Sequence, residues 1–170
     1  MKQREYPCIV LEQSSSEITA NYKAHLVKGK TFIDLTAGMG IDSLFFAKQF
    51  EKGILIERNA ALAEIDLHNY FVLNQTNLEI AVGIDSIDFI NEFDKQVDLI
   101  YIDPARRNEQ GNKVVSLTEY EPNVVSILDK LLNLEDESLK YLFYSKYLEK
   151  SLLTYEIKGN NIIEKNESED

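Results

Sequence analysis

The chain has 170 residues, enough for one domain with a substantial core and too few for two domains of ordinary size. Its single cysteine, Cys8, excludes an internal disulfide and is typical of a reducing cytosol, so we expect a cytoplasmic protein. The formal net charge of −11 disfavours non-specific attraction to nucleic acid, and no apolar run approaches the ~20 residues of a membrane helix.

Ser14 and Glu17 have the spacing of a capping box, which predicts a first helix that continues through residues 18–27 and ends near Gly29. From there, apolar runs and helical patterns alternate between turn residues. We predict a strand at 31–35, a helix at 41–50, a break at Gly53 and a strand at 54–57. A helix at 60–74 should follow, capped by Asn59 and with Leu62, Ile65, Leu67 and Phe71 in the core. The next elements are a strand at 78–82, a short helix from Ser86 or Asp88 to about Phe93, and a strand at 97–102.

The last third is expected to begin with Pro122 at the first position of a helix that reaches about Leu134. A strand at 139–144 and a hairpin around Gly159-Asn160 follow. Such alternation predicts an α/β fold, a Rossmann-like three-layer sandwich with a mostly parallel seven-stranded sheet and an antiparallel edge hairpin. Residues 1–30 would form an N-terminal extension and capping helix, residues 31–164 the domain, and residues 165–170 a disordered acidic tail.

Acidic side chains stand at or just after four of the predicted strands, and the carboxyl ends of parallel strands share one edge of the sheet. These acids are Asp34, Glu57, Asp85 and Asp103. Gly38 and Gly40 in the first turn would let the backbone approach a ligand closely. A carboxylate at Asp34 suits an ammonium group or hydroxyls better than a pyrophosphate, which favours S-adenosylmethionine over a nicotinamide dinucleotide. Glu57 would bind the ribose, Asp85 or the Ser86 N–H the adenine, and Asp103 would face the reactive end.

These ordered motifs resemble the class I S-adenosylmethionine-dependent methyltransferases. A closer resemblance, to bacterial RNA methyltransferases with a THUMP-like carboxyl-terminal region, is carried by residues 11–24, 34–42, 56–59, 102–107 and 120–123 and covers roughly residues 9–134. It implies that residues 31–164 are a class I methyltransferase domain. The implied cofactor-binding residues are Asp34, Thr36, Ala37, Gly38, Gly40, Glu57, Arg58, Asp85, Ser86 and Asp103. Family members are longer, so RNA binding is expected to depend on a region outside this chain.

The expected reaction is methyl transfer to a nitrogen or oxygen of RNA, with Asp103, Pro104 and Arg106 as the catalytic residues. Asp103 would orient the nucleophile or accept its proton, and Arg106 would pair with a phosphate. Enzymes that stack an aromatic ring on a flipped base carry that ring where this sequence has Arg106. Methylation of carbon 5 of uridine would need a cysteine nucleophile, and the sequence has no cysteine after Cys8.

Two alternatives stay open: methylation of a small molecule or a protein, and a scaffold that binds the cofactor with little turnover. No metal or membrane is expected to take part, and the sequence leaves the oligomeric state open. Lys23 and His25 on the first helix are expected to be solvated rather than catalytic.

Overall fold

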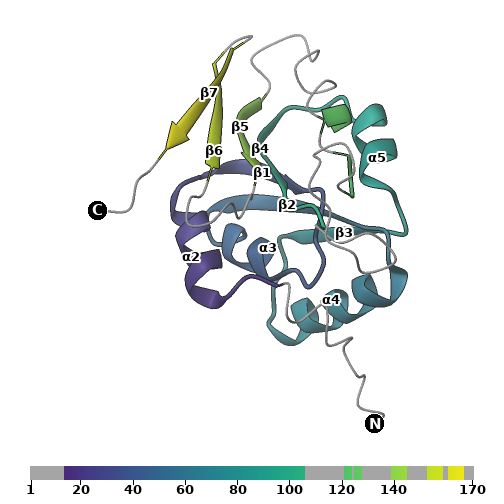
Figure 1. Cartoon of the computed structure of the whole chain (residues 1–170). Coiled ribbons are helices and arrows are strands. Elements are labelled where there is room, and N and C mark those ends of the chain that lie inside the picture. Colours follow the sequence, from purple (N-terminus) through teal and green to yellow (C-terminus); the bar gives the residue numbers. More distant parts are fainter. Residues whose placement is uncertain are drawn as a thin grey trace.

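The computed structural model describes residues 14–105, 121–123 and 125–127, and the backbone of residues 139–144, 153–158 and 161–166. Figure 1 shows these segments as a sheet with helices packed along it. In chain order the elements are α2 (Glu17–His25), β1 (Gly29–Asp34), α3 (Ile41–Phe46), β2 (Phe50–Glu57), α4 (Ala60–Val72), β3 (Leu78–Val82), α5 (Ser86–Glu92), β4 (Val97–Ile102), β5 (Leu139–Tyr144), β6 (Leu153–Lys158) and β7 (Asn161–Asn166).

The strands form one sheet in the order β3-β2-β1-β4-β5-β6-β7. β1 pairs in parallel with β2 and β4, β2 with β3, and β4 with β5, whereas β6 is antiparallel to both β5 and β7. The strand order reverses between β1 and β4, which is where ligands bind in open sheets of this kind. The predicted α/β Rossmann-like fold with a parallel sheet is confirmed.

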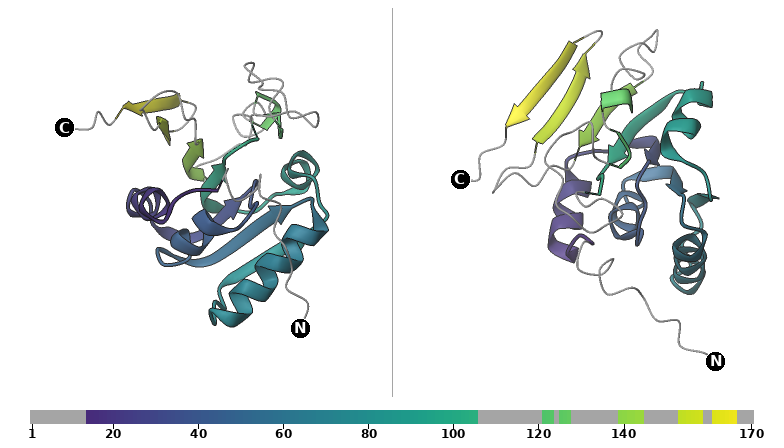
Figure 2. Two further views of the ribbon diagram at one scale, coloured as in Figure 1. Left: turned by 60° about the horizontal axis from the view of Figure 1, so that its bottom comes forward. Right: turned by 45° about the vertical axis from the view of Figure 1, so that its right-hand side comes forward.

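Alternate residues of the central strands point to opposite faces of the sheet, as the two-residue period of a strand requires. On one face Phe32, Leu55 and Leu99 pack with side chains of α2, α3 and α4. On the other face Ile33, Ile56 and Ile100 pack with Ile90 of α5. Helices therefore cover both faces, and the two views of Figure 2 show α4 and α5 on opposite sides.

The first helix and the first two strands begin at residues other than those predicted. Ser16, not Ser14, is the N-cap of α2, and its hydroxyl oxygen accepts a hydrogen bond from the Thr19 N–H at 3.2 Å. Gly29 opens β1 instead of ending a helix. Gly53 lies inside β2, where it pairs with Phe32 of β1 and a side chain would overlap the Phe32 ring. The predicted break at this glycine is therefore wrong, because close packing rather than a turn selects it.

The helix after β2 keeps its predicted Asn59 cap but buries a different face. Asn59 Oδ1 accepts hydrogen bonds from the first turn of α4, and Ile65 is buried as predicted. Leu67 and Phe71 are instead 46% and 84% exposed. The buried side chains are Ala63, Ile65, Asp66 and Tyr70, so the prediction from apolar residues alone selected the wrong stripe.

Two further boundaries differ toward the carboxyl end. The described helical turn at 125–127 follows Asn123, whose side-chain oxygen accepts from the Ser126 N–H at 3.2 Å. Asparagine supplies a capping acceptor that proline lacks, so Pro122 precedes the cap instead of occupying the first turn. β7 continues to Asn166, two residues into the expected disordered tail. The rest of that predicted helix, residues 1–13 and residues 167–170 lie outside the described part of the chain.

Candidate active site

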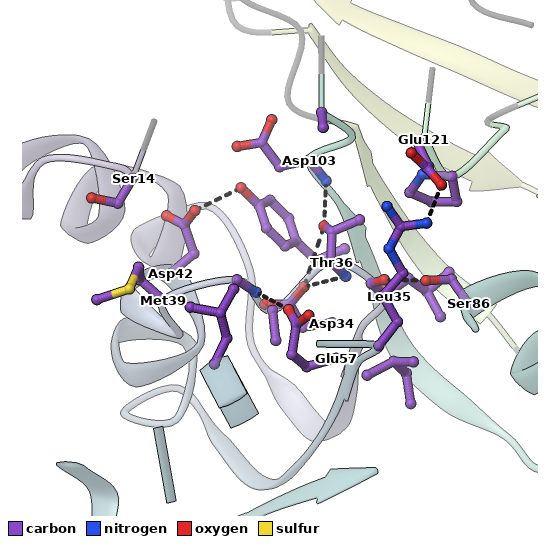
Figure 3. Close-up of a pocket in the computed structure, with 18 of the residues that line it drawn as sticks. Ser14, Asp34, Leu35, Thr36, Met39, Asp42, Glu57, Ser86, Asp103 and Glu121 are labelled. Carbon is purple, nitrogen blue, oxygen red and sulfur yellow. Dashed lines mark hydrogen bonds and ion pairs between the residues drawn. The ribbon is translucent and has the colours of Figure 1, made fainter. Parts of the chain in front are cut away.

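A pocket opens at the carboxyl ends of β1, β2 and β4 (Figure 3). It contains nine of the predicted site residues: Asp34, Thr36, Ala37, Gly38, Glu57, Arg58, Asp85, Ser86 and Asp103. Gly40 and Pro104 are not among the residues that line it, and Arg106 lies outside the described residues. The sheet thus brings together side chains that are up to 69 positions apart (103 − 34) in the sequence.

Asp34, at the end of β1, holds the turn that follows it. Its carboxylate accepts hydrogen bonds from the Thr36 N–H at 2.9 Å and from the Ser43 hydroxyl at 2.5 Å. The residue is 1% exposed, and burial raises the pKa of its carboxyl to about 7 although both hydrogen bonds oppose the shift. Asp34 therefore organises the turn, which the sequence interpretation of a ligand-facing acid did not include.

The turn is also tied to the neighbouring strands. The Thr36 hydroxyl oxygen accepts from the Asp103 N–H at 2.7 Å, and the Ala37 N–H donates to the Ile56 carbonyl at 3.2 Å. The end of β1 is thereby joined to the ends of both β4 and β2. Such cross-links hold the three strand ends in fixed relative positions at the pocket.

The two turn glycines have different surroundings. Both have positive φ angles, +57° at Gly38 and +64° at Gly40, which L side chains rarely adopt. The Gly38 N–H donates to Glu57 Oε2 at 2.9 Å, so Gly38 forms part of the pocket. At Gly40 a Cβ would overlap the Tyr70 hydroxyl of α4. Gly40 therefore permits close packing against α4, and not the approach to a ligand that the sequence suggested.

Glu57 lies at the end of β2 with both carboxylate oxygens held by backbone groups. Oε2 accepts from Gly38 and Oε1 accepts from the Asn59 N–H at 2.7 Å. The residue is 8% exposed, and burial raises the pKa of its carboxyl against the effect of these two hydrogen bonds and of Arg58. Because a carboxylate offers about four lone-pair sites, each oxygen retains capacity to accept from a ligand.

The residues next to Glu57 form one end of the pocket. Arg58 forms an ion pair with Glu121, and this contact raises the pKa of the guanidinium. Asp85 caps α5 by accepting from the Ile87 N–H at 2.8 Å. The Ser86 hydroxyl donates to the Leu35 carbonyl at 2.5 Å, so its side chain is committed to the turn.

Behind the turn, Asp66 of α4 is fully buried, and neither carboxylate oxygen has a hydrogen-bond partner among the described residues. Burial, together with the nearby carboxylates of Glu57 and Asp34, raises the pKa of its carboxyl to about 8. Burial also raises the pKa of the neighbouring Tyr70 hydroxyl. Asp66 is therefore protonated over most of the neutral range.

The other end of the pocket contains a cluster that the sequence reasoning missed. Lys23, expected to be solvated, is 1% exposed and donates to the Tyr101 hydroxyl at 2.7 Å, to Asp42 Oδ2 at 3.0 Å and to Ser15 Oγ at 2.9 Å. The helical spacing of Lys23 could have predicted its burial. Lys23 shares one helical face with Ala20, Ala24 and Val27, all of which are buried. His25, by contrast, is exposed as expected.

Carboxylates dominate the described lining of the pocket. They come from Asp34, Asp42, Glu57, Asp85, Asp103 and Glu121, whereas Arg58 is the one cationic side chain in that described lining. Such a pocket disfavours a pyrophosphate and suits a neutral or cationic ligand that carries hydroxyls or an amine. Within the described residues there is no group of three or more metal-ligating side chains. No described helix has the length and apolarity to cross a membrane.

Comparisons with known proteins give structural matches only. No family model matches the chain. None of the curated proteins matches it. Among solved structures, a candidate methyltransferase from Porphyromonas gingivalis W83 superposes with a TM-score of 0.62 and 30% sequence identity, over 80% of this chain and 32% of that one. The chain thus spans about a third of the length of that protein.

Two shorter proteins match over most of their length. A candidate methyltransferase from Streptococcus mutans, solved in complex with SAH (S-adenosylhomocysteine), gives a TM-score of 0.55 at 13% identity, over 88% of this chain and 92% of that one. An rRNA methylase from Streptococcus thermophilus gives a TM-score of 0.53 at 12% identity, over 88% of this chain and 93% of that one. The chain therefore has the Rossmann-like fold of these methyltransferases.

Proposed function

We propose that this chain is a class I methyltransferase domain that uses S-adenosylmethionine. The observation that carries the proposal is the position of Glu57: two backbone N–H groups hold its carboxylate, one of them from the glycine turn, at the edge where β1 and β4 also end. A fixed carboxylate at this place is suited to accept hydrogen bonds from both hydroxyls of a ribose. The SAH-bound neighbour of the same fold supports the proposal.

The remaining predicted residues take their roles from this placement. The adenine would lie beside Asp85 and Ser86, which line the same pocket as Glu57. The sulfonium cofactor supplies a methyl group that is transferred by in-line displacement. Asp103, at the end of β4, would orient the nucleophile and accept its proton. Pro104 is buried, and we propose that it shapes the chain that carries Asp103.

We propose RNA as the methyl acceptor, at a nitrogen or oxygen atom, with Arg106 as a phosphate-binding residue. The rRNA methylase of similar fold supports this substrate class. The THUMP-like region expected from the sequence would lie outside this chain and would strengthen its weak binding of RNA. The division into an N-terminal extension and a domain and a cytoplasmic location belong to the same proposal.

One observation favours a different acceptor. Six carboxylates line the described pocket and the chain carries a net charge of −11, which repels a polyanion. A cationic or neutral small molecule, or a basic protein, is therefore the second candidate acceptor.

A labelled-methyl assay separates these functions. The purified protein is incubated with labelled S-adenosylmethionine and either an RNA pool, a metabolite extract or a protein extract. We expect incorporation into RNA that is lost in Asp103→Asn. Incorporation into metabolites or protein alone would support the second candidate. Binding of SAH without any incorporation above the Asp103→Asn background would support a scaffold.

A further inference from the structure

Three buried carboxyl groups converge around the glycine turn that follows β1. Asp34 ends β1, Glu57 ends the neighbouring strand β2, and Asp66 lies on α4. Asp34 and Glu57 line the pocket (Figure 3), whereas Asp66 does not and is 0% exposed. A Cβ added at Gly40 would lie 3.4 Å from Asp66 Cγ, so the Asp66 carboxyl packs directly against the turn.

Hydrogen-bond donors reach only two of these three carboxyls. Asp34 and Glu57 each accept two hydrogen bonds, and Arg58 adds a favourable positive charge beside Glu57. Neither oxygen of Asp66 has a hydrogen-bond partner in the part of the chain that the structure describes. Donors stabilise the ionised form of a carboxyl, and a buried carboxyl that lacks them favours the neutral acid. A proton taken up by the three carboxyls therefore resides on Asp66.

The surroundings of Asp66 offer no compensating charge. The titratable groups that face it come from β2, β1 and α4, and they are Glu57, Asp34 and Tyr70. Burial keeps Tyr70 neutral, because it raises the pKa of the hydroxyl. Lys23 is the buried cation of the described residues, and its ammonium group is paired with Asp42 at 3.0 Å. Ionised Asp66 would thus add a third negative charge where no cation is in contact.

We propose that Asp66 holds the proton of this carboxyl cluster, so that Glu57 stays ionised at the ribose, and that loss of this proton weakens binding of the cofactor. Asp66 is a positioning residue, because it does not line the pocket and acts through the turn and through Glu57. The inference rests on the proposed function and adds to it a dependence of cofactor affinity on pH.

Ionisation of Asp66 would act on the pocket in two ways. A buried carboxylate without donors is costly, so the charged form favours a turn that opens to water over the closed turn that forms the pocket. Repulsion between carboxylates is mutual, so a charge on Asp66 also disfavours the ionised form of Glu57. A bound ligand excludes water from the turn, and both effects are stronger in its presence.

The affinity should be highest at neutral pH and should fall as the pH rises. The pKa of Asp66 is raised to about 8, so about nine-tenths of the molecules hold this proton at pH 7 and about one-tenth at pH 9. If the protonated form alone binds, the apparent dissociation constant for SAH rises about 10-fold between these two pH values.

Calorimetric titration with SAH at pH 7 and pH 9 compares the wild-type protein with Asp66→Asn, which keeps the shape of the side chain but does not ionise. Glu64→Gln is the matched control, because Glu64 is an exposed acid on the same helix that does not line the pocket. The amine of SAH titrates in the same way in every titration, so the comparison between variants isolates Asp66. Circular dichroism at both pH values confirms that each protein is folded.

We expect Asp66→Asn to bind SAH within about 2-fold of wild type at pH 7 and about 10-fold more tightly than wild type at pH 9. Glu64→Gln should follow the wild type at both values. Titrations at pH 8.5 in buffers of different ionisation enthalpy should show that the wild type takes up a proton on binding and that Asp66→Asn does not. A residue with a purely structural role would change stability without this proton uptake.

Parallel pH profiles in the wild type and Asp66→Asn would overturn the inference, as would binding by the wild type without proton uptake. Asp66→Leu protects the test against misfolding of Asp66→Asn, because it fills the same space with an apolar side chain. It should show the same weak pH dependence as Asp66→Asn, and a wild-type profile in this variant would also contradict the role of Asp66. If the wild-type protein does not bind SAH at pH 7, the proposed function itself fails.

Discussion

Glu57→Gln tests the proposed ribose contact with little change of volume. In the wild type each carboxylate oxygen accepts one backbone hydrogen bond, at 2.9 Å from Gly38 and at 2.7 Å from Asn59. The amide replaces one oxygen by an NH2 group, which faces one of these N–H groups as donor against donor. The variant therefore loses a backbone hydrogen bond as well as the charge that the ribose hydroxyls would meet.

Hydrogen bonds to a charged group contribute about 1.5–3 kcal/mol, so SAH should bind Glu57→Gln about 10- to 150-fold more weakly. The measurement is calorimetric titration, with circular dichroism to confirm that the variant is folded. Glu79→Gln is the control, because Glu79 is an exposed glutamate on β3 that does not line the pocket. If Glu57→Gln binds within about 2-fold of Glu79→Gln, the ribose is not held by Glu57 and the reasoning is refuted.

Three further predictions concern stability. Gly40→Ala should lower the free energy of unfolding by about 2–4 kcal/mol in urea titrations, because the new methyl group overlaps the Tyr70 hydroxyl and the positive φ is strained for alanine. Gly83→Ala is the control: its φ is also positive but the space around it is open, so it should lose only about 1–2 kcal/mol. Equal losses in the two variants would contradict the packing of Gly40 against Tyr70. Ser16→Ala should cost about 1 kcal/mol and Ser14→Ala much less, and the reverse order would restore Ser14 as the cap. The pKa of Asp66 is raised from 3.8 to about 8, so the folded state binds more protons than the unfolded chain between these values, and wild-type stability should fall as the pH rises from about 5 to 8. Thermal unfolding of Asp66→Asn should show a smaller fall, and identical profiles would exclude Asp66 as the source.

Local patterns in the sequence were sufficient to predict the central sheet and one edge of the pocket. Short apolar runs predicted β3 and β4 at their observed positions, and the acids at or just after the strand ends predicted the convergence of Glu57, Asp85 and Asp103. These predictions succeeded because parallel strands all have their carboxyl ends at one edge of the sheet, whatever the details of packing.

The errors arose where contacts between distant segments decide the structure. Lys23 is buried because Asp42 and Tyr101 accept hydrogen bonds from its ammonium group. These partners lie 19 and 78 residues away in the sequence, so the helix considered alone suggested a solvated lysine. Leu67 and Phe71 were placed in the core for their apolarity, but α4 turns Asp66 and Tyr70 toward the glycine turn instead. A helical pattern fixes which residues share a face and leaves open which face meets the sheet.

Asp34, which precedes the first turn, also shows that local sequence patterns do not reveal tertiary contacts. Asp34 lies in the pocket as predicted, yet its carboxylate is occupied by Thr36 and Ser43. The sequence places an acid at the end of a strand, and only the three-dimensional contacts reveal whether the acid faces a ligand or holds the turn. Glu57, whose oxygens retain acceptor capacity, is therefore the more direct ligand for a ribose.

A crystal structure of the chain grown with SAH is the most direct measurement of the central claim, that the strand ends of this sheet surround a single adenosyl ligand. We predict density in the pocket with the ribose hydroxyls hydrogen-bonded to Glu57 and the adenine beside Ser86. A ligand bound outside this pocket, or a ribose without any contact to Glu57, would contradict the account.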